Sequence, residues 1–336
     1  MRFLTLLIFI LFIGCDGEIP KRDTLGPHDQ ILVIADSSDF VKTKKALEKS
    51  LEAEVLLPAP EKLFTLKFMP LEKYERYKRW QNILILSILD EEGKADGFVK
   101  SVLSEEAQQK VTNGEVFLGI QKNIWTKNQG LAYLVGKDAK SISEFLELNG
   151  ERLLEAFLEV QKQQLLYVMF KVGEQDEISE ELWEKFGWKV RVQFDYVVAN
   201  ADEDNDFVWL RRFYPDRFLS VKSFEGTGTE NYSPEFWINL RNEIGVKYHQ
   251  SSEVDTLHTT AEKVDFLGYQ ATKLTGLWAI RKDLVGGPFR SYCFFDAKAQ
   301  KYFLVDLAVF APGEAKKNYL TQLEIIASTF EAKPIK

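Results

Sequence analysis

The segments FRSYCFF (residues 289–295), DAKAQK (296–301) and YFLVDLAVF (302–310) decide how the C-terminal half of this chain folds. Two aromatic and aliphatic runs flank one short polar loop, a pattern typical of an antiparallel hairpin. Upstream runs at 207–213, 218–224 and 268–281 have the same character, and helical patterns occupy 234–244 and the stretch after Pro312-Gly313. We therefore predict an antiparallel sheet with one face covered by helices.

Two further features of this half predict how its strands begin and turn. Apolar and polar residues alternate from Trp188 to Val198, which predicts a strand lying on a core. The acidic stretch 202–206 predicts the turn that follows this strand. Gly286-Gly287-Pro288 predicts another turn, ahead of the hairpin at 289–310.

The N-terminal half alternates between strand-like and helix-like patterns. Strands are predicted at 31–35, 63–69, 83–89, 115–120 and 130–135, and helices at 39–53, 98–111 and 140–170. The chain is thus expected to have an α+β fold with two modules. Residues 31–172 are expected to form a mixed α/β module and residues 177–332 the antiparallel one. The boundary is expected at Gly173-Glu174-Gln175-Asp176, although a simple turn between two helices has the same pattern.

The first residues of the chain have the pattern of an export signal rather than of a folded element. Arg2 precedes an apolar run at 3–13, which is too short to span a bilayer and suits a signal peptide over residues 1–14. Phe12-Ile13-Gly14-Cys15 resembles the lipobox of bacterial lipoproteins, and the resemblance implies that Cys15 is acylated and tethered through residues 15–30. An ordinary secretory signal and an uncleaved anchor are the alternatives.

Composition limits the classes of function. The 336 residues are 45% apolar, and 43 basic against 51 acidic residues give a net charge of −8, which argues against nucleic-acid binding. Of the two cysteines, Cys293 lies in an apolar strand without a basic neighbour. We interpret Cys293 as a buried apolar residue rather than a reactive thiol.

Motifs for catalysis are missing from the sequence. There is no P-loop, no G-x-S-x-G and no H-E-x-x-H, and no metal or cofactor is predicted. His249 and His258, with Glu253 and Asp255, are candidates for an acid-base or metal site, although a solvated loop explains them equally. Residues 70–80 mix basic and aromatic side chains, which predicts either a patch for anionic headgroups or a helical turn with its aromatics inward.

Asp306 interrupts the apolar strand at 302–310, and Arg290 lies on the neighbouring strand. A buried carboxylate must be paired or protonated, so we expect Asp306 to pair with Arg290. Such a pair serves either the structure or the binding of a ligand.

Together with Cys15, several short segments resemble an uncharacterised family of bacterial lipoproteins classed as a domain of unknown function. These segments are Trp209-Leu210-Arg211-Arg212, Gly287-Pro288-Phe289-Arg290, Pro312-Gly313, Lys316-Lys317, Tyr319-Leu320 and Leu323-Glu324. The resemblance covers the mature chain and implies no assigned activity.

The expected function is therefore that of a non-enzymatic binding or scaffolding lipoprotein of the cell envelope. It would be held by lipid at Cys15, face the periplasm or the exterior, and have a protein or glycan of the envelope as partner. The alternative is an envelope hydrolase of unfamiliar type that uses carboxylates and histidines. A deep pocket that holds His249, His258 or Asp306 with polar partners would favour the enzyme, and a convex or shallow apolar surface would favour the binding protein.

Overall fold

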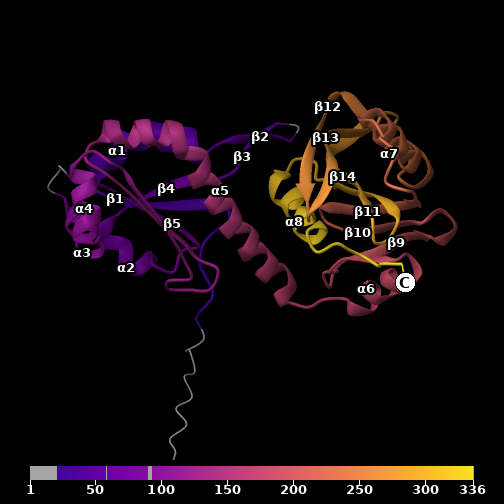
Figure 1. Ribbon diagram of the computed structural model, residues 1–336, viewed down its shortest axis with the longest axis horizontal. Coiled ribbons are helices and arrows are strands. Elements are labelled where there is room, and N and C mark those ends of the chain that lie inside the picture. The colour runs from indigo at the N-terminus through magenta and orange to yellow at the C-terminus, as the bar shows by residue number, and fades with distance from the viewer. Residues whose placement is uncertain (1–20, 58, 90–92, 336) are drawn as a thin grey trace, which may run out of the picture.

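The computed structural model describes residues 21–57, 59–89 and 93–335 (Figure 1). The expected signal peptide and Cys15 lie outside the described residues. The fold is α+β, as predicted, with a mixed α/β N-terminal region and an antiparallel C-terminal sheet. No helix among the described residues is long and apolar enough to cross a membrane.

A five-stranded sheet organises the N-terminal region, in the order β4-β1-β5-β7-β6. Strands β1 (Gln30–Ala35), β4 (Thr65–Pro70), β5 (Asn82–Ile88) and β7 (Gly130–Gly136) are parallel, and β6 (Phe117–Lys122) is the antiparallel edge. Every residue of β5 and β7 is buried. Continuous apolar strands of this kind need helices on both faces of the sheet.

Helices provide that cover in two layers (Figure 1). The cluster on one face includes α1 (Ser37–Leu51) and α5 (Ala139–Lys171), and the cluster on the other includes the helices α2 (Tyr74–Tyr77), α3 (Lys94–Val102) and α4 (Glu105–Thr112). The layers make this region a three-layer α/β sandwich. A short 3₁₀ turn, η1 (Leu71–Lys73), precedes α2.

Two local features differ from, or add to, the sequence predictions in this region. The single helix expected at 98–111 is two helices, because Ser104 starts α4 by accepting the Ala107 N–H at 3.3 Å. A Cβ at Gly150, inside α5, would lie 2.5 Å from Ser50 Oγ on α1. Glycine at this position allows the two helices to approach closely.

A seven-stranded antiparallel sheet organises the C-terminal region, in the order β12-β13-β14-β15-β11-β10-β9. The strands are β9 (Val197–Asp202), β10 (Phe207–Arg212), β11 (Asp216–Glu225), β12 (Glu253–Phe266), β13 (Tyr269–Ile280), β14 (Val285–Asp296) and β15 (Lys301–Phe310). The hairpin predicted at 289–310 is confirmed as β14–β15, which closes at the pair Asp296 and Lys301. The turn predicted at 202–206 is confirmed as η2 (Glu203–Asn205), between β9 and β10.

This sheet has helices on both faces rather than on one. Helix α7 (Pro234–Tyr248) packs on one face, and α8 (Lys317–Ala327), α6 (Asp176–Lys185) and the end of α5 pack on the other. We call these the α7 face and the α8 face. Because side chains alternate along a strand, each strand contributes to both cores.

Two predictions in this region are wrong for physical reasons. Only β8 (Trp188–Lys189) of the stretch 188–198 pairs as a strand with β16 (Glu331–Ala332) before β9 begins. Much of its backbone bonds side chains instead, since Gln175 Nε2 donates to the carbonyls of Gln193 and Tyr196. The apolar side chains of this stretch are buried at Trp188, Val190, Val192 and Tyr196 but exposed at Phe194 and Val198, so the alternation indicates a partly buried face and not a neighbouring strand.

The turn predicted at 286–288 is the second error, because these residues belong to β14. Gly287 is paired with Trp278, and a Cβ there would lie 2.0 Å from the Val309 carbonyl oxygen. The glycine serves close packing between strands rather than a change of direction.

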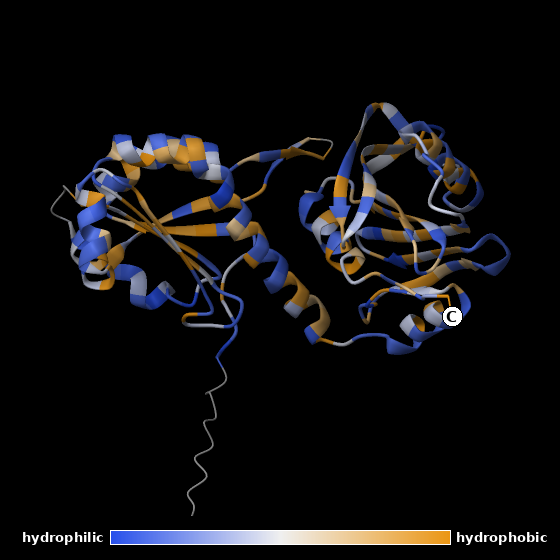
Figure 2. Ribbon diagram, viewed as in Figure 1, coloured by the Kyte–Doolittle hydropathy of each residue, from blue (hydrophilic) through white to orange (hydrophobic). Residues whose placement is uncertain are grey.

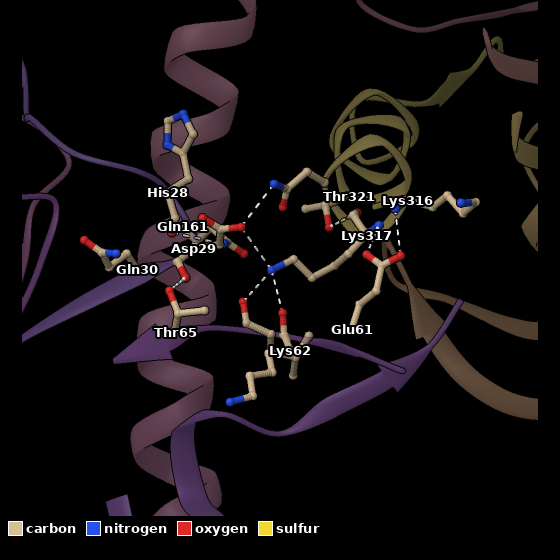
Figure 3. A network of polar contacts seen from close by, with 12 residues as sticks. His28, Asp29, Gln30, Glu61, Lys62, Thr65, Gln161, Lys316, Lys317 and Thr321 are labelled. Atoms are coloured by element: carbon tan, nitrogen blue, oxygen red, sulfur yellow. Dashed lines mark hydrogen bonds and ion pairs between the residues drawn. The ribbon is translucent and has the colours of Figure 1, made fainter. Parts of the chain in front are cut away.

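The two regions meet at the N-terminus of α8 (Figure 3). The hairpin of β2 (Glu54–Leu56) and β3 (Pro60–Lys62) presents Glu61, whose carboxylate accepts the N–H groups of Lys316 and Lys317 at 2.8 Å each. Lys317 Nζ donates to the carbonyls of Lys62 and Leu63 and pairs with Asp29 at 3.3 Å. These contacts join the N-terminal region directly to the α8 face of the C-terminal sheet.

The described part of the expected tether, residues 21–30, is packed rather than free. Leu25 forms a bridge with Trp80, and Asp23 pairs with Lys171 at the end of α5. Gln30 already begins β1. The chain therefore attaches to the N-terminal region from Lys21 onward.

Candidate functional site

A cavity of about 210 Å³ lies between α7 and the sheet, and we call it the α7 cavity. Its lining combines aromatic and aliphatic walls with a few polar groups. The lining residues are Trp209, Arg211, Asp216, Phe218, Arg241, His249, Gln250, Ser252, Trp278, Ile280, Val285, Ala308 and Phe310. A small apolar cavity with a few convergent polar groups is typical of a small-molecule site.

A polar row crosses the sheet beneath α7. Ser220, Asp306 and Ser291 are register neighbours on β11, β15 and β14, on the α7 face of the sheet. Asp306 is 2% exposed, and its Oδ1 accepts the Ser291 hydroxyl at 2.6 Å. The row places a carboxylate in the middle of the sheet, where it needs a cationic partner.

Arg241 supplies that partner from α7. Its Nε donates to Asp306 Oδ1 at 2.8 Å, and both side chains are 3% exposed. The guanidinium also lies over the Phe289 ring, with Cζ 3.9 Å from the ring centroid. It makes no other hydrogen bond with the part of the chain that the structure describes, yet it lines the cavity. Its remaining N–H groups are therefore donors available to a ligand.

His249 ends α7 at the edge of this polar row. Its Nε2 lies 3.3 Å from Ser220 Oγ, and its ring packs edge-on against Trp209, with centroids 4.6 Å apart. Burial lowers the pKa of His249 to about 4, because the attraction of Asp306 is too weak to offset the loss of solvation and the charge of Arg241 opposes protonation. The imidazole is neutral at pH 7.

Arg211 and Asp216 form the second ion pair of the cavity. Arg211 Nη2 and Nε donate to the two oxygens of Asp216 at 2.9 and 3.3 Å. The guanidinium stacks with Phe213 and Phe218. Each arginine of the cavity is thus matched by one carboxylate, and its net charge is close to zero.

Two tryptophans that line the cavity have unused donors. The indole N–H groups of Trp209 and Trp278 are buried without a hydrogen-bond partner among residues 21–57, 59–89 and 93–335. A buried donor without a partner costs about 1–3 kcal/mol. A ligand or water that accepts these protons would recover that free energy.

The structure separates the two residues that the sequence suggested as a pair. Arg290 is in register with Leu307, one residue beyond Asp306, so its side chain leaves β14 on the α8 face. There Arg290 Nη1 pairs with Glu324 of α8, which also accepts the Tyr292 hydroxyl at 2.9 Å. Arg290 and Asp306 are therefore parts of two different ion pairs on opposite faces.

The four residues suggested as an acid-base or metal site are likewise not gathered in one site. Of these, only His249 lines the α7 cavity. His258 pairs with Asp255 at 2.9 Å on an exposed part of β12, whose first residue is Glu253. Among the described residues, no group of three or more His, Cys, Asp and Glu side chains is placed to hold a metal ion.

Sequence reasoning missed the residues that complete the cavity. Arg241 stands in an ordinary amphipathic helix, and Trp278 in an ordinary apolar strand, so neither produces a motif. The only sequence feature that pointed to such a residue was Asp306 inside an apolar strand, because a buried carboxylate needs a cationic partner. Cys293 is buried beside this site, and burial raises the pKa of its thiol, which makes it unreactive.

Two family models match consecutive stretches of the chain. Residues 24–169 match a domain of unknown function, DUF8532, and residues 175–329 match another, DUF4837. The two stretches meet where α5 ends. No curated protein matches the chain.

Two solved structures are similar to parts of the chain. A protein from Bacteroides thetaiotaomicron is 10% identical over 44% of this chain and 45% of its own length, with a TM-score of 0.27. A mutant of the protein Mog1 is 11% identical over 44% of this chain and 92% of its own length, with a TM-score of 0.30. This chain thus spans less than half of the Bacteroides protein. Similarity at these TM-scores does not show a shared fold or function.

Proposed function

We propose that the protein is a lipid-anchored, non-enzymatic binding protein of the cell envelope whose α7 cavity holds a small ligand. The observation that carries the proposal is the unused hydrogen-bonding capacity of this apolar cavity. The guanidinium of Arg241 makes one hydrogen bond to the described residues, through its Nε, and the indole N–H groups of Trp209 and Trp278 have no acceptor among those residues. Buried N–H groups in proteins are normally hydrogen-bonded, so donors without acceptors are unfavourable unless a ligand or water accepts their protons.

The lining defines the chemistry of the ligand. Trp209, Phe218, Trp278 and Phe310 suit an aromatic or aliphatic body, because most of the surface they offer is apolar. The free donors require one acceptor group, such as a carboxylate or carbonyl. The two internal ion pairs leave little net charge, so the acceptor gains from hydrogen bonds more than from long-range attraction.

A cavity-filling variant tests the site directly. Ala308 is 5% exposed and lines the cavity, so Ala308→Leu places three additional carbons where the ligand would lie. Phenylacetate, phenylacetamide and toluene serve as probes, and tryptophan fluorescence reports binding. We expect phenylacetate and phenylacetamide to bind more tightly than toluene, and Ala308→Leu to weaken their binding at least tenfold.

Ala261→Leu is the matched control, because Ala261 is exposed on β12 and distant from the cavity lining. It should bind the probes as the unmodified protein does. The proposal fails if the three probes leave the fluorescence unchanged, or if Ala308→Leu binds them as tightly as the control.

Two observations favour the alternative of a hydrolase. His249 lines the α7 cavity, as expected of an enzyme, and Ser220 Oγ lies 3.3 Å from His249 Nε2, close to the distance of a nucleophile from its base. Three features weigh against it: Ser220 is 1% exposed and absent from the cavity lining, the pKa of His249 is about 4, and Asp306 bonds Arg241 and Ser291 rather than the imidazole. We therefore place this function second.

A fluorophosphonate probe separates the two functions. The binding proposal predicts no covalent labelling, and Ser220→Ala should bind phenylacetate normally. Labelling that disappears in Ser220→Ala would establish the hydrolase instead.

The anchor is the second part of the proposal, and it rests on the lipobox-like sequence ending at Cys15. Mass spectrometry of the mature protein should find an acylated N-terminal cysteine. Cys15→Ser should release the protein from the membrane fraction, because one or more acyl chains supply the attachment. If the variant stays in that fraction with an intact Met1, the apolar segment itself is the anchor.

A further inference from the structure

Three segments from distant parts of the sequence meet where the described chain begins. They are residues 21–25, residues 122–128 at the end of β6 and in the loop to β7, and residues 167–172 at the end of α5, and we call them the basal surface. Lys127 N–H donates to the Arg22 carbonyl at 3.0 Å, and Lys21 Nζ donates to the Asn123 carbonyl. Tyr167 donates its hydroxyl to Asp23 at 3.1 Å. These contacts fix the three segments as one surface.

The charge of the basal surface is opposite to that of the whole chain. The chain carries −8, whereas these segments hold five basic side chains, Lys21, Arg22, Lys122, Lys127 and Lys171, and one acidic side chain, Asp23. Asp23 is neutralised by Lys171. A net positive surface on an acidic protein indicates a specific anionic partner.

Apolar side chains accompany this charge. Trp125 is 43% exposed and Ile124 37% exposed at the tip of the β6–β7 loop, and Val172 is 72% exposed at the end of α5. Figure 2 colours the last turns of α5 largely hydrophobic. Trp125 is held in place, because its Nε1 donates to Tyr74 Oη at 2.8 Å and Lys78 Nζ lies 4.8 Å from its ring centroid.

Basic and aromatic side chains of this kind are typical of the interface between a bilayer and water. The position of the chain's start identifies the partner further. Lys21 follows Cys15 by six positions, so an anchor at Cys15 keeps Lys21 within about 20 Å of the membrane. The surface nearest to the anchor is thus the basic and aromatic one.

We infer that the basal surface docks on anionic phospholipid headgroups and so fixes the orientation of the anchored protein. The inference rests on the proposed anchor for the proximity of the membrane, but not for the chemistry of the surface. Lys122 and Lys127 face the headgroups, and Trp125 and Ile124 insert at the level where indole rings are favoured. The stretch 70–80, in which the sequence suggested such a patch, contributes mainly support, since Tyr74 is buried and Lys78 pairs with Glu75.

The test uses the mature acylated protein in vesicles that carry brominated lipids, which quench tryptophans within the bilayer interface. The chain has seven tryptophans, so the signal of Trp125 is the difference between the unmodified protein and Trp125→Phe. We expect quenching of Trp125 on vesicles of phosphatidylglycerol and little on vesicles of phosphatidylcholine. Lys122→Gln with Lys127→Gln should lower the ratio of docked to undocked protein about 25-fold, roughly fivefold for each charge.

Lys137→Gln with Lys140→Gln is the matched control, because Lys137 follows the end of β7 and Lys140 lies in the first turn of α5, at the end of β7 opposite to the basal surface. It should leave the quenching unchanged. Equal quenching on the two kinds of vesicle, or no quenching of Trp125, would overturn the inference, and the latter would leave an acidic protein as the partner of this surface.

Failure of the anchor has a different signature. A protein that lacks acyl chains shows the unmodified mass and does not float with phosphatidylcholine vesicles. A protein that floats with both kinds of vesicle while Trp125 stays unquenched is anchored but not docked.

Discussion

An ion pair joins each face of the seven-stranded sheet to its covering helix, and the two pairs differ in what surrounds them. On the α8 face Arg290 and Glu324 have side chains 17% and 24% exposed, at the margin of a continuous apolar core. On the α7 face Arg241 and Asp306 are 3% exposed and lie beside a cavity. The Arg290–Glu324 pair thus stays near solvent, and the Arg241–Asp306 pair is buried at the centre of its face.

The contrast indicates which face has been shaped for something other than stability. Burying an ion pair seldom stabilises a protein more than apolar residues of the same volume would. The core of the α8 face is packed with apolar side chains such as Leu307, Val309 and Leu323, and the Arg290–Glu324 pair lies outside it, at a pocket that this face shares with the N-terminal region. The α7 face differs in having its charge pair at the centre and a cavity within its own core, as expected of a site that holds a ligand.

The largest expected effect is on the α7 pair. Asp306→Asn leaves the guanidinium of Arg241 without its counter-charge in a buried position. We expect the free energy of unfolding to fall by about 3–5 kcal/mol, measured by urea denaturation. Asp283→Asn, at an exposed aspartate in the β13–β14 turn, is the control and should change little. An unchanged midpoint for Asp306→Asn would mean that this carboxylate faces water.

A second effect on the α7 face depends on pH. The pKa of His249 is lowered from 6.5 to about 4, so between these values the unfolded chain binds a proton that the folded protein does not. The contribution of His249 to the free energy of unfolding is therefore fully present above pH 6.5. It falls by about 2–3 kcal/mol as the pH drops towards 4.

The measurement compares urea denaturation at pH 7 and pH 4 for three proteins. His249→Gln removes the titration, so it should lose less stability than the unmodified protein over this range. His258→Gln is the control, because His258 is exposed and should leave the pH dependence as it is. Equal losses in the unmodified protein and His249→Gln would contradict the assigned burial of the imidazole.

A substitution in the Arg290–Glu324 pair on the α8 face should lower the free energy of unfolding less than Asp306→Asn does. Glu324→Gln keeps an acceptor for the Tyr292 hydroxyl but removes the charge that Arg290 faces, in a place that solvent partly reaches. We expect a loss of about 1–2 kcal/mol and no change in the binding of phenylacetate at the α7 cavity. A loss as large as that of Asp306→Asn would remove the distinction between the two faces.

Most of the fold could be predicted from the sequence, because burial imposes a period on each element. The hairpin β14–β15 and the buried strand β1 follow from such patterns. The stretch 188–198 shows the limit of this reasoning. Its alternation correctly reports that Trp188, Val190 and Val192 are buried, but no local pattern tells whether another strand lies alongside.

The candidate site could be predicted only in part, because its partners are distant in the chain. An aspartate in the apolar strand at 302–310 required a cation, and Asp306 has one. The partner is Arg241, which stands 65 positions away on a helix. Arg290 was nearer, but the register of β14 with β15 places it on the other face. Neither the helix nor the register is encoded in a local motif.

The smallest expected effect concerns the junction that the α8 face makes with the N-terminal region. Glu61 accepts two backbone N–H groups at the start of α8, where a negative charge also favours the helix dipole. Glu61→Gln keeps an acceptor oxygen and removes the charge, so unfolding by urea should become easier by about 0.5–1 kcal/mol. Glu54→Gln, on the exposed side of the same hairpin, should have no effect. If Glu61→Gln costs as much as Glu324→Gln, the junction rather than the internal pair is the main polar support of the α8 face, which would make the two regions depend on each other for stability.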